Sequence, residues 1–427
     1  MSTRFLGSAA LAAALALAGT PLQAADMPMP ASAQAPVEVQ RFVHALILAN
    51  PQVQASRAAL ETGAAQRDAA AQPLYNPELE LGIERSADDA RTLGISQTLD
   101  WAGKRSARSA VGEQALLLAS ARWRLSVWTL GNELLNGLAR HQTAVAREAL
   151  AARSEATMTE LSALAERRFR AGDLDQVELS LARLTMTDAR IQHATRRGET
   201  VAARERLRAL AVDSPSRAWP VLAVPPLADA LEITHEAALR SLPEVQAAER
   251  QVDLNEAEVT VRRRERRADP TLSVHAGEQA GESLVGLGIS VPLLVRNRFD
   301  HEVRAALGAR DEARFGADAV WRQAQARLDS ADERYALLRN AWAEWEGTGQ
   351  SSLAIQDEQL HRLWQAGELG TTPYLIQLQQ TFELQDHALE LRLALWEGWF
   401  EWLRASGRID AWLALDTLTD GQPGAQR

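Results

Sequence analysis

The chain contains the same series of short segments twice, in the same order. The last of them is a turn, Ala-Gly-Asp-Leu at 171–174 and Ala-Gly-Glu-Leu at 366–369, and the two copies lie 195 residues apart. Chance similarity between alanine-rich helices would not keep both order and spacing. The chain is therefore two copies of one unit of roughly 190 residues, a period too long for a solenoid repeat. The other matches, spaced by 192 to 194 residues, are NPQVQASRAAL (50–60) with LPEVQAAERQV (242–252), NPELELGIE (76–84) with DPTLSVHAG (269–277), and LGISQTL (93–99) with LGISVPL (287–293).

The two copies define the predicted organisation of the chain. Each contains a helix, two short strands, a long helix, a turn and another helix. We expect the strand pairs at 76–100 and 269–293, and the helical turns, or tips, at 170–175 and 365–372. The predicted segments are a signal peptide (1–24), a Pro-rich linker (25–37), repeat 1 (38–212), a connecting segment (213–229), repeat 2 (230–410) and a tail (411–427).

The predicted strands each have one apolar and one polar face. In PELELGIER, three apolar side chains alternate with glutamates and a glycine, which is the period-two pattern of a half-buried strand. Four such strands cannot form a core of their own, so something outside the chain must complete them. If the leucine face meets lipid, Glu78, Glu80 and Glu84 face a watery lumen. The opposite arrangement would place charges in lipid at a cost of several kcal/mol.

The predicted helices are much longer than those of most globular proteins. No proline occurs between Lys104 and Arg170, so this helix would extend on the order of 100 Å. We expect 174–211 and 235–266 to lie end to end beside it, and 372–405 with 38–72 to do the same in the second copy. Apolar residues after each turn follow the heptad spacing of supercoiled helices. They are Leu174, Val177, Leu181, Leu184 and Ile191, with Asp188 in the remaining seam position, and Leu375, Leu378, Phe382, Leu389, Leu393, Trp396, Phe400 and Leu403.

The N-terminus has the pattern of a secretory signal peptide. Arg4 precedes an apolar run that ends in small residues at Ala24 or Ala25. A retained helical anchor is the alternative, but the run is short for a membrane span. No cysteine follows the run, which excludes lipid attachment there. No later segment has about 18 consecutive apolar residues, so no transmembrane helix is expected.

Composition argues against several classes of function. The chain has a net charge of −10 and a pI of about 5.5. This acidic balance argues against a nucleic-acid partner, because such a partner is itself negatively charged. The absence of cysteine excludes disulfides and thiolate metal ligands. The eight histidines show no short metal-binding spacing, and no phosphate loop, nucleophile elbow or metalloprotease helix is present. We therefore expect no enzyme, no cofactor and no resident metal.

In the order of its motifs, the chain resembles the TolC family of outer-membrane efflux channels, and within it the heavy-metal (CzcC-like) branch. The resemblance extends from about residue 38 to 410. Any one of the motifs is weak, but the ordered set in two copies is specific. They are Asn76-Pro77 and Asp269-Pro270 opening the strand pairs, DWAGKR (100–105), VPLLVRNR (291–298), and the turns RAGDL and QAGEL.

This resemblance implies a fold and a set of partners. The fold is mainly α with a small β part: long coiled-coil hairpins form an α-barrel, and each chain contributes four strands to a trimeric transmembrane β-barrel. The location is the outer membrane of a Gram-negative bacterium, with the helices in the periplasm. The partners are two further copies, a periplasmic adaptor (membrane fusion) protein and an inner-membrane RND transporter. The channel itself would conduct passively.

The resemblance also suggests candidate site residues, each with a purely structural alternative. Gly172 would end a helix in the left-handed conformation. Asp175 and Glu178 have capping-box spacing, and Thr372 before Pro373 would cap the last long helix. The adaptor-contact tips are Arg170, Gly172, Asp173, Leu174, Gly367, Glu368, Leu369 and Gly370; the candidate pore-mouth acids are Asp175, Glu178 and Asp188; and the membrane-interface aromatics are Tyr75 and Trp101, which a packed helix–strand junction would explain equally well.

Other functions remain as alternatives. The exported substrate would be heavy-metal cations, with small organic compounds or drugs as the alternative. A periplasmic adaptor would have one helical hairpin between two β-rich halves, whereas this chain has two hairpins, each after a strand pair. A secreted coiled-coil scaffold would not explain why the predicted strands have one apolar and one polar face.

Overall fold

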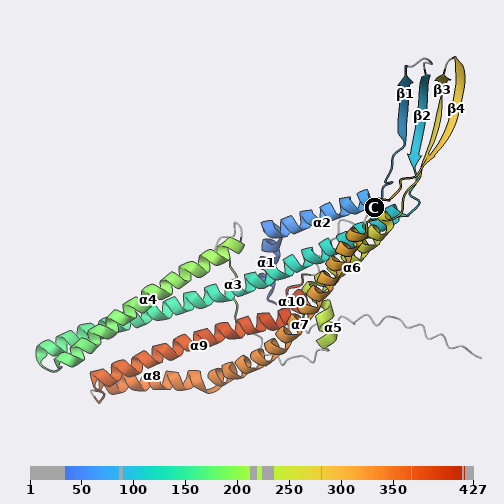
Figure 1. The fold of residues 1–427 in the computed structure, drawn as a ribbon. Coiled ribbons are helices and arrows are strands. Elements are labelled where there is room, and N and C mark those ends of the chain that lie inside the picture. The colour runs from blue at the N-terminus through green and yellow to red at the C-terminus, as the bar shows by residue number, and fades with distance from the viewer. Residues whose placement is uncertain are drawn as a thin grey trace, which may run out of the picture.

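The computed structural model describes residues 34–85, 90–211, 219–223, 235–279, 281–366, 368–415 and 418. The predicted signal peptide, most of the Pro-rich linker, most of the connecting segment and Gly367 lie outside these residues. The molecule is elongated, with a small sheet at one end and the turns of two helical hairpins at the other (Figure 1).

The chain is mainly α with a small β part, as predicted, and the same order of elements occurs twice. None of the described helices is both long enough and apolar enough to span a membrane. The elements of the first copy are α1 (Val37–Ala49), α2 (Pro51–Ala70), β1 (Glu78–Glu84), β2 (Ala90–Thr98), α3 (Lys104–Ala171) and α4 (Gln176–Leu210). Those of the second are α5 (His235–Ser241), α6 (Pro243–Glu265), β3 (Thr271–Gln279), β4 (Glu282–Ser290), α7 (Asp300–Glu344), the π-helix η3 (Trp345–Gly349), α8 (Gln350–Gln365), α9 (Thr371–Ala405) and α10 (Ile409–Leu413).

The four strands form one antiparallel sheet in the order β1-β2-β3-β4. The central pairing of β2 with β3 joins the two repeats, with Ile95 opposite Val274. One face of the sheet is mostly apolar because alternate paired rows place aliphatic side chains on the same side, with Arg91 and Glu278 as the exception. These side chains, each between 43% and 81% exposed, are Leu79, Leu81, Ile83, Leu93, Ile95, Leu272, Val274, Val285, Leu287 and Ile289.

A buried carboxylate joins the sheet to the helices. Asp269, only 4% exposed, lies just before β3 and pairs with Lys104 at the start of α3 (Nζ–Oδ2, 2.9 Å). The Tyr75 hydroxyl, just before β1, donates to the same oxygen at 2.8 Å, and the Ala102 N–H donates to Oδ1 at 3.3 Å. Lys104 is the only lysine of the chain. Both strand pairs and the long helix therefore meet at one anion.

The ionisation of this junction follows from its contacts. Burial acts to raise the pKa of Asp269, but the hydrogen bonds from Lys104 and Tyr75 outweigh it, and the pKa falls below its ordinary value. Burial, together with the bond to Asp269, raises the pKa of Tyr75 to about 12. At neutral pH the carboxyl is thus charged and the phenol is a hydrogen-bond donor.

The largest core lies midway along the molecule, where the two repeats meet. Trp128 of α3 packs there with Trp402 of α9, Tyr335 of α7 and Trp412 of α10, all at most 1% exposed. Trp412, Leu413 and Leu415, predicted as part of the tail, belong to this core instead. The predicted boundary after residue 410 is too early, because these three apolar side chains are at most 1% exposed.

The arrangement of the long helices agrees with the prediction in repeat 1 and differs in repeat 2. Helices α4 and α6 both lie along α3, as expected. Helix α9 lies along α7, but α2 packs against α3 rather than beside the second long helix. That second helix is interrupted by η3, whose Trp-Glu-Gly-Thr-Gly segment contains two glycines. Glycine is a weak former of regular α-helix, and the rare π-helical turn lies at these two glycines.

We predict that Asp269→Asn lowers the free energy of unfolding by about 3 kcal/mol, because it leaves the Lys104 ammonium largely buried without its anion. Tyr75→Phe removes one hydrogen bond and should cost about 1 kcal/mol. Urea denaturation of the detergent-solubilised protein, followed by far-UV circular dichroism, measures both. The control is Asp68→Asn, whose carboxylate is 67% exposed beside Arg67 and should matter little. Equal effects of Asp269→Asn and Asp68→Asn would contradict a structural role for the junction.

Candidate functional site

The first tip is a tight turn closed by backbone and side-chain hydrogen bonds. Gly172 has φ +85° and ends α3 in the left-handed conformation, as predicted. Asp175 caps α4: its carboxylate accepts the Glu178 N–H at 2.8 Å, and the Glu178 carboxylate accepts the Asp175 N–H at 3.3 Å. The predicted capping box is confirmed. Both acids are therefore used to hold the turn.

The second tip differs from its prediction. Gly370, not Thr372, is the N-cap of α9, and no side chain caps this helix. Pro373 lies inside the first turn instead of at its first position. This is tolerated because none of the first N–H groups of a helix has an intrahelical acceptor, so proline loses nothing there. Gly367 lies outside the described residues.

The predicted contact residues of the tips divide into an exposed and a buried set. Arg170, Gly172, Asp173, Glu368 and Gly370 are exposed. Leu174 is only 8% exposed and packs in a second core between the two hairpins, and the half-buried Leu369 packs against that core. Leu174 thus supports the tip from inside, a correction to its predicted place on the contact surface.

An aromatic stack closes the second tip, and a cation–π contact joins it to the first. The rings of Trp364 (α8) and Tyr374 (α9) stack with centroids 4.6 Å apart and an interplanar angle of 7°. The Arg168 guanidinium of α3 lies over the Trp364 ring, 5.7 Å from its centroid. Cation–π contacts of this kind add to apolar packing. The two hairpin ends therefore form one unit made from both repeats.

Most of the heptad predicted from Leu174 to Ile191 is not buried within the chain. Val177, Leu184 and Ile191 are 75%, 67% and 58% exposed. The buried residues of this part of α4 are instead Leu179, Ala182, Thr185 and Ala189. The small side chains allow α4 to approach α3 closely, and this rotates the larger heptad residues outward. An apolar stripe is left on the outside of the first hairpin.

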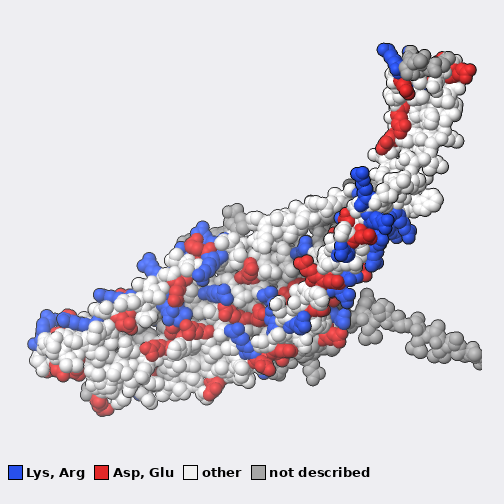
Figure 2. Space-filling view, in the orientation of Figure 1, with Lys and Arg blue, Asp and Glu red and all other residues white. Residues whose placement is uncertain are grey.

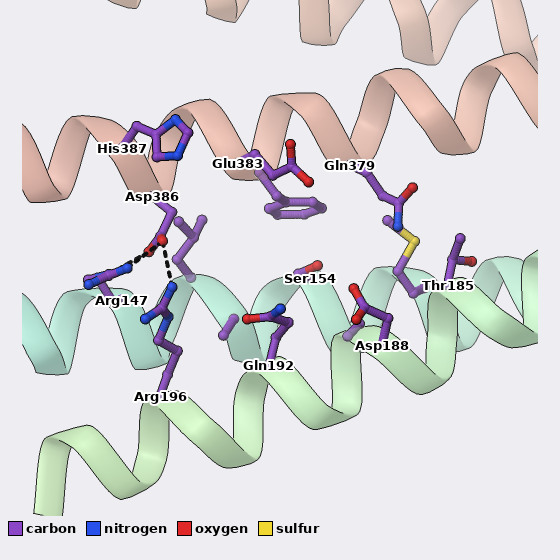
Figure 3. A pocket seen from close by; sticks show the side chains of 15 residues that line it. Arg147, Ser154, Thr185, Asp188, Gln192, Arg196, Gln379, Glu383, Asp386 and His387 are labelled. Atoms are coloured by element: carbon purple, nitrogen blue, oxygen red, sulfur yellow. Dashed lines mark hydrogen bonds and ion pairs between the residues drawn. The ribbon is translucent and has the colours of Figure 1, made fainter.

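The candidate pore-mouth acids do not come together. Asp175 and Glu178 lie at the tip, whereas Asp188 lines a cavity of about 250 Å³ farther along α4. Figure 3 shows this cavity between α3, α4 and α9, with Asp188 and Gln192 opposite Gln379 and Glu383. Glu383 and Asp386 of α9 are the acids that sequence reasoning missed at this level.

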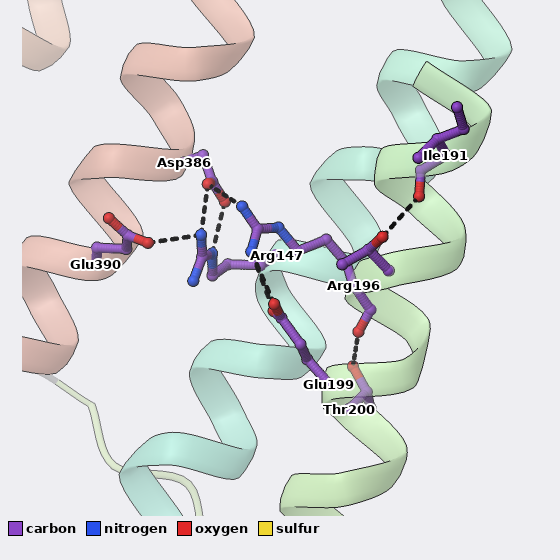
Figure 4. Close-up of polar contacts among 8 residues, drawn as sticks. Arg147, Ile191, Arg196, Glu199, Thr200, Asp386 and Glu390 are labelled. Atoms are coloured by element: carbon purple, nitrogen blue, oxygen red, sulfur yellow. Dashed lines mark hydrogen bonds and ion pairs between the residues drawn. The ribbon is translucent and has the colours of Figure 1, made fainter. Parts of the chain in front are cut away.

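Asp386 is the centre of an ion network at the end of the cavity (Figure 4). Arg147 of α3 donates to both of its oxygens at 2.6 Å, and Arg196 of α4 donates to one of them at 2.8 Å. Arg147 also pairs with Glu390 at 2.6 Å, and Arg196 with Glu199 at 3.0 Å. Three helices from both repeats are thus joined through one carboxylate.

The network fixes the charge state of Asp386. Burial acts to raise the pKa of this carboxyl, but the hydrogen bonds and charges of Arg147 and Arg196 outweigh it and lower the pKa below its ordinary value. Asp386 is therefore an anion at neutral pH. The network holds the first hairpin against α9 at the level of the cavity.

The structure separates the two aromatic residues predicted at the membrane interface. Tyr75 is part of the Asp269 junction, which supports the packed helix–strand alternative for this residue. Trp101 is 79% exposed beside the end of the sheet. Glu78, Glu80 and Glu84 are exposed on the polar face, opposite the leucines of β1. Their role as lumen residues stays a prediction.

Comparison with known proteins identifies the fold. Residues 42–211, less than half of the chain, match the model of the Outer membrane efflux protein family. The first repeat carries that family's pattern. No curated protein matches the chain.

Solved structures with the same fold extend over nearly the whole chain. The Campylobacter jejuni CmeC outer membrane channel has a TM-score of 0.75 at 13% sequence identity. The match covers 92% of this chain and 91% of the CmeC chain. The outer-membrane channel OprN has a TM-score of 0.73 at 18% identity, with coverages of 87% and 90%. CusC, described for its transmembrane channel formation, has a TM-score of 0.69 at 16% identity, with coverages of 87% and 92%. The chain therefore has the fold of outer-membrane efflux channels.

We predict that Asp386→Asn lowers the free energy of unfolding by about 2 kcal/mol at pH 7, because a half-buried carboxylate then no longer balances two arginines. Since the native pKa is depressed, this contribution is complete above the ordinary aspartate value of about 4 and is lost as the pH falls below it. Urea titrations at pH 7 and pH 3 measure the difference from the native protein, which should shrink at pH 3.

The matched control is Glu205→Gln. Its carboxylate is 49% exposed and pairs with Arg204 and Arg208 within α4. This change should cost much less stability than Asp386→Asn, because solvent screens the charges of an exposed pair. A loss in Asp386→Asn that is no larger than in Glu205→Gln, or one that persists unchanged at pH 3, would contradict the proposed ion network.

Proposed function

We propose that the chain is the outer-membrane channel component of a tripartite efflux pump, which conducts substrate passively from the periplasm to the exterior. The observation that carries this proposal is the sheet: its whole apolar face is exposed and both of its edges are open. A surface of this kind fits lipid and further strands. The fold shared with solved outer-membrane channels supports it.

The sheet has the properties of one segment of a membrane barrel. Its strands contain seven or nine residues, close to the roughly nine to eleven that a tilted strand needs to cross a bilayer. In lipid, the unpaired backbone groups of β1 and β4 must find partners, and only closure of the sheet provides them. Three copies supplying four strands each would close it, with Glu78, Glu80 and Glu84 toward the lumen and Trp101 near the interface.

The helical part has apolar surface that a ring of copies would cover. The stripe of Val177, Leu184 and Ile191 lies on the first hairpin. On the second repeat, Phe315 and Leu337 of α7 are 72% and 70% exposed. Side-by-side packing of hairpins from neighbouring copies would bury both surfaces and form an α-barrel. We propose a homotrimer with its helices in the periplasm of a Gram-negative bacterium.

The tips are the proposed docking surface for a periplasmic adaptor protein. Arg170, Gly172 and Asp173 of the first turn, and Glu368 and Gly370 of the second, are exposed and available to it. The adaptor would connect the channel to an inner-membrane RND transporter, which supplies the energy. Opening would be an untwisting of the inner helices, biased by the adaptor.

The proposed cargo is heavy-metal cations, on the resemblance of the sequence to the metal branch of the family. Small organic compounds or drugs are the alternative. Among the described residues, His, Asp and Glu do not gather in groups that could hold a metal ion. An acidic lining at Asp188 and Glu383 would raise the local concentration of cations by its field alone.

We predict small, cation-selective conductance steps from the purified protein in a planar bilayer, measured with a salt gradient. The double change Glu178→Gln and Asp188→Asn should enlarge the steps and reduce cation selectivity, because it removes acids near the closed mouth. Glutamine at 178 still accepts a hydrogen bond, so the turn should persist.

The matched control is Glu160→Gln, an exposed acid of α3 that belongs to none of the predicted sites. It should leave the steps unchanged. Steps that are unaffected by the double change would place the gate elsewhere while retaining the channel. No insertion and no conductance from a well-folded sample would rule out the channel and leave the coiled-coil scaffold.

A further inference from the structure

One row of paired residues on the polar face of the sheet carries only two side chains beyond glycine. In one continuous row, Glu80 pairs with Gly94, Gly94 with His275, and His275 with Gly286. Directly paired residues of an antiparallel sheet lie on the same face. A Cβ built on Gly94 would contact the Cβ atoms of both His275 and Glu80, at 3.3 and 3.7 Å. In this row, therefore, only a carboxylate and an imidazole project from the polar face.

The imidazole of His275 extends across β4 toward the edge of the sheet. Its Nε2, Cε1 and Cδ2 atoms occupy the space that a Cβ on Gly286 would need. Any residue other than glycine at 286 would displace the ring. The ring thus points away from Glu80 of its own chain and toward the open edge of β4.

The other open edge of the sheet, β1, carries the complementary charge. The polar face of β1 consists of Glu78, Glu80, Gly82 and Glu84, so three of its four positions are carboxylates. Figure 2 shows acidic residues along this edge of the sheet. When β1 of one copy pairs with β4 of the next, most registers place a glutamate beside the imidazole. Because Gly286 has no side chain, no β4 side chain in this row lies between the His275 imidazole and that glutamate.

We propose that His275 and a β1 glutamate of the neighbouring copy form a pair across each contact between chains, and that the resulting ring makes the ion selectivity of the barrel pH-dependent. This inference rests on the proposed trimeric channel. It assigns a site that is incomplete in one chain, because the imidazole and its carboxylate come from different copies.

The sign of the pH effect follows from the charges. Histidine changes its charge between about pH 5 and 8. With neutral imidazoles the glutamates of the lumen are uncompensated and attract cations; with protonated imidazoles part of that charge is cancelled. The other groups on this face of the neighbouring strands supply no positive charge that could replace the imidazole. The side chains of β1 there are glutamates, those of β2 beside His275 are the uncharged Thr92 and Ser96, and the charged residue of β4 is Glu282 at its far end. Arg91 and Glu278 lie on the apolar face, opposite each other.

The test is the reversal potential of the purified protein in a bilayer with a potassium chloride gradient, at pH 8 and at pH 5. The native channel should lose at least about twofold in its potassium-to-chloride permeability ratio at the lower pH. In His275→Gln this change should be much smaller. Gly286→Ala retains the histidine but displaces its ring, and it should also weaken the response. His301→Gln, at the exposed start of α7, is the control and should behave as the native protein.

Heat dissociation of the oligomer on gels provides a second, independent measurement. A protonated imidazole gains a carboxylate partner only in the assembly, so its contribution is present at pH 5 and lost as the pH rises through the histidine range. The native oligomer should therefore exceed His275→Gln in dissociation temperature at pH 5 and match it at pH 8.

The outcomes separate this inference from the proposed function. Channels whose selectivity responds to pH equally in the native protein and in His275→Gln would overturn the His–Glu pair and retain the channel. Equal dissociation temperatures at pH 5 would overturn it as well. A well-folded native protein that forms neither an oligomer nor a channel would overturn the proposed function, and the pair with it.

Discussion

The two open edges of the sheet are the constraint on which the rest of the molecule depends. A strand in lipid must satisfy each of its backbone groups, and neither β1 nor β4 does so within one chain. The Leu, Ile and Val side chains of the apolar face are each at least 43% exposed, so the described part of the chain leaves this face largely uncovered. In the proposed trimer, the helices must present three such sheets at matching height and angle. The Asp269 junction does this by fixing the start of α3 to both strand pairs.

The duplication gives the chain both a four-stranded sheet and a set of long packed helices. Pairing of β2 with β3 makes one sheet from two repeats, while α4 and α6 lie along α3 and link the same repeats in the helical part. The two copies have also diverged. Repeat 2 breaks its long helix at η3, and its last helix lacks the capping box that Asp175 and Glu178 provide in repeat 1.

Features set by neighbouring residues were predictable from the sequence. The alternation in β1 predicted its two faces, Gly172 predicted a left-handed helix end, and Asp175 with Glu178 predicted the capping box. Each depends on backbone geometry within a few residues. The seam of α4 was not predictable in this way, because close approach to α3 through Ala182 and Ala189 outweighed the apolar heptad.

Contacts between distant parts of the chain were the least predictable. Asp386 and Arg147 are 239 residues apart, and no local pattern pairs them. One signal was present: the apolar heptad of α9 has a gap between Phe382 and Leu389, where Asp386 lies. A charge on a face that is otherwise apolar indicates a partner on the facing helix, but it does not say which residue that is. The roles of the tip residues and acids stay predictions for the same reason.

The outward apolar face of the sheet has a consequence for how the protein is made. The helical part has two hydrophobic cores within the single chain. In the proposed channel, the aliphatic side chains of the sheet are covered only when other copies and lipid are both present. Synthesis of such a channel would pass through a monomeric intermediate, in which the helical part is folded and the sheet still exposes its apolar face. The rate of oligomer assembly would then compete with the rate of nonspecific association through these apolar surfaces. The yield of channels would depend on the lifetime of the monomer.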